Sequence, residues 1–169
     1  NTAPFSKGYY VLDKQTKKVY TMNASIWDEL SLDTNSLRDQ SLLSFNEAYV
    51  NQIIIKNEAL SFTMTAKEED GKVQWTSEEQ LLDESKVNSF IASLNGKTIE
   101  EFVEDAANDE SLEKYGLQEP TTTIRIQLND QEDSTMVIYV GNAEENTAYV
   151  TLDKKHIYQV ESSALLPRD

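Results

Sequence analysis

The alternation of apolar and polar residues predicts β-strands along much of the chain. Residues 60–65 switch between apolar and polar side chains, which turns one side of the segment toward a core and the other toward water. A β-branched run at 53–55 precedes them, and the Asp70-Gly71 turn leads into a third strand at Trp75. This part of the chain therefore reads as an antiparallel meander.

One amphipathic helix is expected at about 83–95, with its apolar stripe against the meander. Asp83 is the predicted N-cap, and Gly96 comes just after the end. Short helices are expected at about 23–30 and 108–115, the second closed by Gly116 in a left-handed cap. The stripe of the main helix has helical spacing: Val87, Phe90, Ile91 and Leu94.

Strands return after the second short helix. Apolar and polar residues alternate over 123–128 and over 136–140, which predicts two strands. The pair Gly141-Asn142 is expected to break the second of these strands. A last hairpin is expected at 147–153 and 156–160. The predicted fold class is α+β, dominated by antiparallel sheet.

The two ends of the chain repeat each other. Residues 9–14 align without gaps with 149–154, and residues 19–27 align with 157–165, the first copy having a turn two residues longer. A repeated hairpin followed by a helix start indicates internal duplication. We therefore expect 1–43 to be the tail and junction of one repeat unit, and 44–169 to be a complete unit.

Charge separates the same two segments. The net charge is −15, yet residues 1–43 hold five basic and five acidic side chains, so all of the excess lies in 44–169. The excess of acidic residues argues against binding to nucleic acid or to an anionic membrane surface. There is no cysteine, which excludes disulfides and thiol catalysis. The chain starts at Asn1 without an apolar signal region, as a trimmed or mature fragment would.

No catalytic constellation is recognisable. His156 is the single histidine, it lies beside two lysines at a predicted turn, and we interpret it as a solvated turn residue. The glycines are scattered singly, so no loop cradles phosphate. Five tyrosines fall in predicted strands, where packing is preferred to glycan binding: Tyr9, Tyr20, Tyr139, Tyr149 and Tyr158.

The acidic segment 99–113 provides the alternative hypothesis of calcium or small-ligand binding. Its carboxylates are suitable ligands for a hard cation, and two of them would share a face if the segment were helical. The acidic turn at 129–133 lacks the glycine and terminal glutamate of an EF-hand loop. The weak metal candidates are Glu100, Glu101, Glu104, Asp105 and Asp109.

These residues together resemble the bacterial domain-of-unknown-function family numbered 4340. The resemblance rests on Trp75, the acid-capped helix after it, and the motif Tyr115-Gly116-Leu117-Gln118-Glu119-Pro120, followed by Tyr139-Val140-Gly141, Tyr149-Val150 and Ile157-Tyr158-Gln159-Val160. The stretch with Tyr20, Trp27, Leu37-Arg38-Asp39 and Phe45 is similar to the junction between successive units of that family. Residues 76–79 depart from the pattern, because the family often has a proline after the tryptophan.

The resemblance implies an extracytoplasmic protein of the bacterial envelope, often membrane-anchored and sometimes associated with ABC-type export or gliding-motility auxiliary components. It implies no catalytic residues and no cofactor. The leading hypothesis is a non-enzymatic interaction or scaffold module whose end hairpins contact a protein partner or another repeat unit.

Overall fold

A computed structural model describes residues 8–23, 34–130, 132 and 134–165 of the chain. The chain forms two compact units, Asn1–Asp39 and Gln40–Asp169. The division falls four residues before the expected one at 43/44, because Leu42 and Leu43 are buried in the core of the second unit. The expected helix at about 23–30, with Trp27, lies outside the described residues.

The first unit contains one hairpin and one short helix in its described part. Strands β1 (Gly8–Leu12) and β2 (Val19–Asn23) pair antiparallel, as the sequence predicted, and a 3-10 helix, η1, spans Thr34–Leu37.

The second unit is built on one sheet with two α-helices. Its helices are η2 (Glu47–Tyr49), α2 (Glu84–Asn95), α3 (Asp109–Lys114) and η3 (Ser162–Ala164). Its strands are β3 (Val50–Asn57), β4 (Ser61–Glu69), β5 (Lys72–Ser77), β6 (Gln80–Leu81), β7 (Ile99–Glu104), β8 (Thr122–Leu128), β9 (Thr135–Glu144), β10 (Thr147–Thr151) and β11 (Ile157–Glu161).

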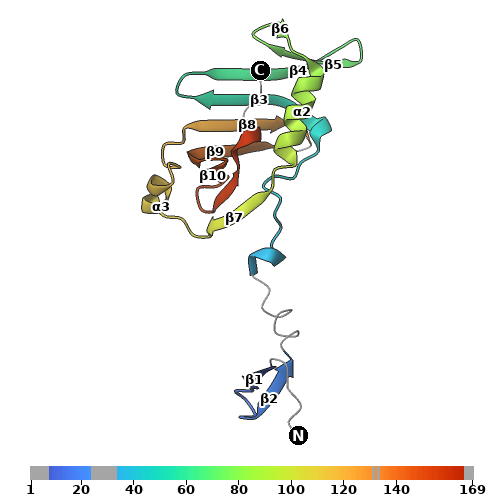
Figure 1. Ribbon diagram of the computed structural model, residues 1–169. Coiled ribbons are helices and arrows are strands. Elements are labelled where there is room, and N and C mark those ends of the chain that lie inside the picture. Colours follow the sequence, from blue (N-terminus) through green and yellow to red (C-terminus); the bar gives the residue numbers. More distant parts are fainter. Residues whose placement is uncertain (1–7, 24–33, 131, 133, 166–169) are drawn as a thin grey trace. The chain divides into compact units, whose positions relative to one another are not determined.

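The nine strands form an antiparallel sheet in the order β6-β5-β4-β3-β8-β9-β10-β11-β7. Figure 1 shows α2 lying across the strands on one side of the sheet. The predicted α+β class with a mainly antiparallel sheet is confirmed. No helix in the described ranges combines the length and apolarity needed to span a membrane.

Helix α2 forms where the sequence predicted it and closes the main core. Asp83 accepts hydrogen bonds from the backbone N–H groups of Ser85 and Lys86, which satisfies two of the free donors at the helix start. The predicted stripe of α2 is buried in one cluster with apolar residues of β3, β4, β5, β8 and β9. The stripe consists of Val87, Phe90, Ile91 and Leu94.

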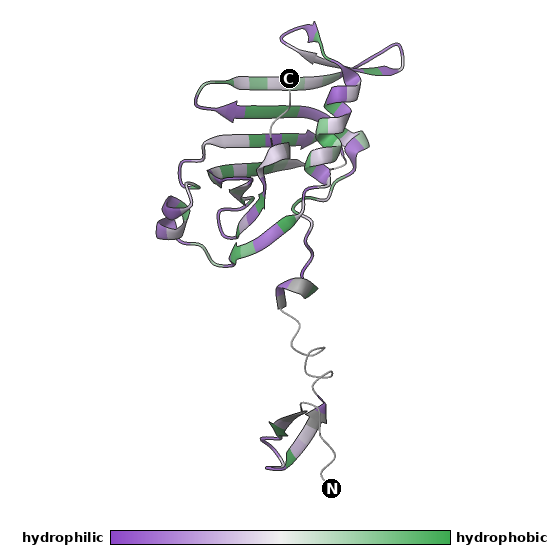
Figure 2. Cartoon of the chain, viewed as in Figure 1, coloured by the Kyte–Doolittle hydropathy of each residue, from purple (hydrophilic) through white to green (hydrophobic). Residues whose placement is uncertain are grey.

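The centre of β3 is hydrophobic, whereas α3 is mostly hydrophilic (Figure 2).

Helix α3 organises a second, smaller core. Its N-cap Asn108 accepts from the N–H of Ser111, and Gly116 after its end has φ +70°, the left-handed cap that the sequence predicted. Leu112, Leu117 and Ile157 are buried together beneath it.

The prediction that Gly141-Asn142 breaks a strand is wrong. Strand β9 runs through both residues to Glu144, with a register shift in its pairing to β10 between Ala148 and Val150. Gly141 is needed there because the backbone of Tyr115 and Gly116 lies against it, leaving no room for a Cβ atom.

The expectation that acids of 99–105 share a helical face is also wrong. Residues Ile99–Glu104 form β7, an edge strand paired with β11. Successive side chains of a strand point to opposite faces, so Glu100 and Glu101 diverge. The strand was hidden because its acids break the apolar alternation that marks a half-buried strand. The short strand β6 was not predicted either.

Candidate functional site

The turn of the first hairpin is organised by a single carboxylate. Oδ1 of Asp13 accepts the backbone N–H groups of Gln15 (2.8 Å) and Thr16 (3.3 Å), and the Thr16 hydroxyl donates to Oδ2 at 2.5 Å. The Thr16 hydroxyl and these two backbone donors hold the pKa of Asp13 below its ordinary value.

The aligned residue of the second hairpin makes the same pattern of side-chain hydrogen bonds. Oδ1 of Asp153 accepts the N–H groups of Lys155 (2.8 Å) and His156 (2.9 Å), and Nδ1 of His156 lies 2.7 Å from Oδ2. His156 thus takes the position three residues after the aspartate that Thr16 has in the first copy. The duplication predicted from sequence therefore extends to local hydrogen bonding, and His156 is a turn residue as expected.

Asp153 makes the stability of the second unit depend on pH in the acid range. Burial by itself would raise the pKa of Asp153, but the N–H groups of His156 and Lys155 and the imidazole outweigh it and lower the pKa to about 2. A carboxyl with a depressed folded-state pKa contributes stability above its ordinary pKa of 3.8 and loses it as pH falls toward 2.

We expect Asp153→Asn to make the stability of the second unit depend less on pH in the acid range. The free energy of unfolding, from urea titrations between pH 4.5 and 2, should fall less in the variant than in the unmodified chain. The difference should be under about 1 kcal/mol, because the side chain is 45% exposed and solvent screens it. Asp13→Asn is the matched control, since it changes the equivalent turn in the other unit. Parallel pH profiles for Asp153→Asn and the unmodified chain would contradict the prediction.

The two hairpins differ in what flanks them. Strands β10 and β11 lie between β9 and β7 in the nine-stranded sheet, whereas β1 and β2 pair only with each other among the described strands. The registers also differ. Val150 pairs with Tyr158, but the aligned Tyr10 pairs with Thr21 and not with Tyr20. A slip of one residue puts Tyr10 and Tyr20 on opposite faces of the first hairpin.

The first hairpin exposes apolar side chains that are covered in the second. Tyr10 is 81% and Val19 61% exposed, while the aligned Val150 and Ile157 are both 0% exposed. Leu12 and Tyr20 are also exposed, whereas the aligned Leu152 and Tyr158 are partly buried against the main core. Tyr10, Leu12 and Val19 lie on one face of the first hairpin, and we call them the hairpin patch.

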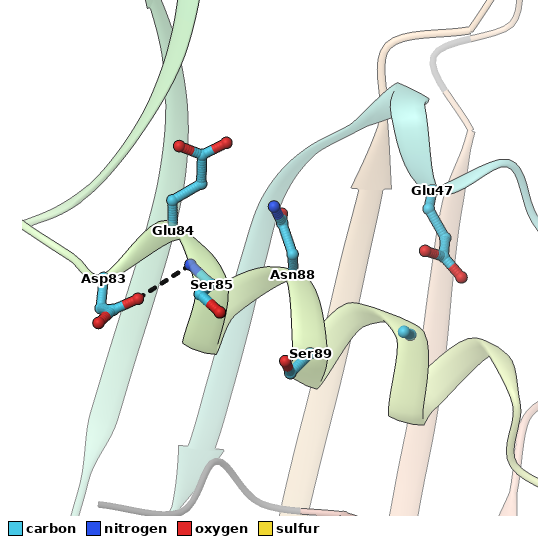
Figure 3. Close-up of a pocket in the computed structure, with 7 residues that line it drawn as sticks. Glu47, Asp83, Glu84, Ser85, Asn88 and Ser89 are labelled. Atoms are coloured by element: carbon cyan, nitrogen blue, oxygen red, sulfur yellow. Dashed lines mark hydrogen bonds between the residues drawn. The ribbon is translucent and has the colours of Figure 1, made fainter.

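A second candidate is an open groove along the outer side of α2, about 770 Å³ in volume. Three of its lining residues are acidic, and Glu47 comes from η2 while the others follow α2 (Figure 3). Two of the acids have structural partners, since Asp83 caps α2 and Glu47 accepts from the Asn95 amide at 3.0 Å. The lining residues are Glu47, Asp83, Glu84, Ser85, Asn88, Ser89 and Ala92.

The weak metal candidates are not gathered into a cluster. Within the part of the chain that the structure describes, no group of three or more His, Cys, Asp or Glu side chains is placed to hold a metal ion. Glu100 and Glu101 are exposed on β7, Glu104 accepts the Ser111 hydroxyl at 2.8 Å, Asp105 follows the strand and Asp109 starts α3.

Lys97 is a buried cation that the sequence did not reveal. It is 6% exposed, and its ammonium donates to the backbone carbonyl of Glu161 at 3.0 Å, tying the segment after α2 to the end of β11. Desolvation lowers the pKa of Lys97, while Glu161 and Glu100 act in the opposite direction. Its hydrogen-bond acceptor, the carbonyl of Glu161, is 64 positions away in sequence, so only the fold identifies this contact.

All five tyrosines expected in strands lie in strands. Tyr139 and Tyr149 pack against the smaller core, and the rings of Tyr115 and Tyr149 lie 4.6 Å apart. Trp75, in β5, is 4% exposed within the main core. For Tyr139, Tyr149 and Tyr158 the packing interpretation is confirmed, whereas Tyr20 is 52% exposed.

Comparison with protein families gives two matches to one family, over residues 1–110 and over residues 75–167. The chain belongs to the family described as Domain of unknown function (DUF4340). The two tandem DUF4340 matches fit the internal repeat. Comparisons with curated proteins and with solved structures gave no match.

Proposed function

We propose that this DUF4340 chain is a non-enzymatic interaction module of an extracytoplasmic bacterial envelope protein, auxiliary to an ABC-type transport system, that binds a protein partner through its first hairpin. The observation that carries the proposal is the hairpin patch, whose aligned residues are covered in the second copy. An isolated two-stranded hairpin is only marginally stable in water, so an added strand would stabilise β1 and β2.

Strand addition is the binding mode that fits this hairpin. Both β1 and β2 are edge strands among the described strands, and the outer edge of such a strand can pair with an extended segment of a partner. The exposed Tyr10 and Val19 would supply apolar contacts that fix the choice of partner.

Absence of catalysis is part of the proposal. His156 and Asp153 form the kind of pair that orients a general base, but no described serine or threonine hydroxyl bonds the other ring nitrogen. The pair instead closes a turn. Calcium binding by 99–113 has no cluster of described carboxylates to support it.

Site-specific photo-crosslinking in the native host tests the proposal. A benzophenone amino acid at Tyr10 of the full-length protein should give adducts with an envelope or transport component. The same probe at Leu81, which is 70% exposed on β6, is the matched control. Tyr10→Ser combined with Val19→Ser should reduce recovery of that component at least fivefold. The same adducts from Leu81, or none from Tyr10, would overturn the proposal.

A further inference from the structure

The sheet of the second unit has a covered face and a largely uncovered one. Ile53 and Ile55 point into the main core beneath α2, so the alternating residues of β3 point to the opposite face. On that opposite face α3 covers only the β9–β11 end, where Tyr139 and Tyr149 pack against its cluster. We call the opposite side of β5, β4, β3 and β8 the open face.

The open face is polar and ordered in rows across the strands. Antiparallel partners share a face, so the register places Thr76, Thr65, Gln52 and Gln127 in one row. The amide of Gln52 donates to the Thr65 hydroxyl at 3.1 Å. The neighbouring row places Thr63, Ile54 and Arg125 together, and the next places Ser61, Lys56 and Thr123.

The charge of this face is opposite to that of the unit. Residues 40–169 hold ten basic and 25 acidic side chains, yet four of those basic side chains lie on the open face with one acid, Glu69. The basic residues are all exposed, and none forms an ion pair with a described acid: Lys56, Lys67, Lys72 and Arg125. The register places Lys67 and Lys72 toward one end of the face and Lys56 and Arg125 toward the other. Four unpaired cations on one face of so acidic a unit favour an acidic occupant.

An acidic surface of suitable character lies on the other side of the same unit. The groove along α2 exposes Glu47, Asp83 and Glu84, with Ser85, Asn88 and Ser89 as further hydrogen-bonding groups. Because α2 covers the face of the sheet opposite to the open face, the acidic groove and the basic face lie on opposite sides of the unit. One copy cannot bring these two surfaces together, but two copies can.

We propose that the open face of one copy binds the α2 groove of a second copy, in a head-to-tail arrangement that leaves one of each surface free. The contact is heterologous, so association continues beyond the dimer as concentration rises. At physiological ionic strength the Debye length is about 8 Å. Salt therefore screens the repulsion between distant acids of the two copies more than the attraction between charged groups in contact across the interface.

The size of the face sets the expected strength. Four strands about 4.8 Å apart, each contributing about six residues at about 3.4 Å, give a face of roughly 400 Å². An area of this size on each partner is about half of what a standard protein–protein interface buries per partner, which is typical of weak complexes. We therefore expect a Kd in the range of about 10 to 500 μM.

Sedimentation equilibrium of the whole chain at 50, 150 and 500 mM salt tests the proposal. We expect self-association at 150 mM salt, with a Kd at least tenfold weaker at 500 mM. Lys56→Gln with Arg125→Gln removes charge from the open face, and Glu47→Gln with Glu84→Gln removes it from the groove. Each double variant alone should have a Kd at least tenfold weaker than the unmodified chain.

Mixing the two double variants is the decisive measurement. One retains the groove and the other retains the open face, so the mixture should form a complex that stops at 1:1, with the Kd of the unmodified chain. Lys155→Gln, a charge loss at an exposed turn, should leave the Kd unchanged, as should Tyr10→Ser, which affects only the hairpin interaction proposed above. A monomer at all concentrations, undiminished association of either double variant, or a mixture without the 1:1 complex would overturn the proposal.

Discussion

Gly141→Ala is expected to destabilise the second unit by about 3 kcal/mol, lowering its thermal midpoint by about 10 °C. A Cβ atom at this position would overlap the carbonyl oxygen of Tyr115 and lie 3.0 Å from the carbonyl carbon and oxygen of Gly116. These are backbone atoms, so no side-chain rotation relieves the overlap. The N–H of Asn142 donates to the same Tyr115 carbonyl at 2.9 Å, and this bond would be lost if β9 moved away from the end of α3.

Gly71→Ala is the matched control for this substitution. Gly71 has φ +72°, but a Cβ there would meet nothing within 4 Å, so only the left-handed backbone disfavours alanine, by about 1 kcal/mol. Differential scanning calorimetry of both variants separates steric overlap from backbone strain. Equal losses in the two variants would show that the close approach at Gly141 has no energetic weight.

Leu94→Ala should have a comparable effect, about 3 kcal/mol, for a different reason. Leu94 is 0% exposed and belongs to the apolar stripe that joins α2 to the sheet. Removing three buried carbon atoms loses their transfer free energy and leaves a cavity beneath the helix. The expected loss should be visible as a lower urea midpoint with an unchanged m-value.

Leu81→Ala provides the comparison, because Leu81 is 70% exposed on β6 and its truncation should change stability by less than about 0.5 kcal/mol. A loss at Leu94 no larger than that at Leu81 would mean that α2 is not required to close the core.

The two glycine positions illustrate how far sequence reasoning reaches. Gly116 was predicted correctly as a left-handed cap, because the helix it ends and the leucine that packs back are neighbours in sequence. Gly141 was predicted wrongly as a strand break. A glycine is required at position 141 because the backbone of Tyr115, which is 26 positions earlier, lies against it. No local sequence pattern predicts this contact.

The acidic segment shows the same limit for the candidate site. The local pattern of 99–105 has no apolar alternation, and the segment becomes a strand because β11 offers it an edge to pair with. Glu100, Glu101 and Glu104 were consequently assigned to the wrong geometry, whereas Asp109 lies in the helix that the sequence predicted. The open face was missed for a related reason, since its cations come from β3, β4, β5 and β8, which only the strand order brings together.

The sequence by itself determined the local elements: helix α2 with its cap, the meander from β3 to β5, the turns at Asp13 and Asp153, and membership in a repeating family. Those features depend on side chains a few positions apart, where periodicity and capping act directly. Only the tertiary structure decided which hairpin copy is covered, which face of the sheet stays open, and where strands β7 and β9 end. These depend on pairings between segments far apart in the chain, whose free energy comes from burial and close approach that no single segment encodes.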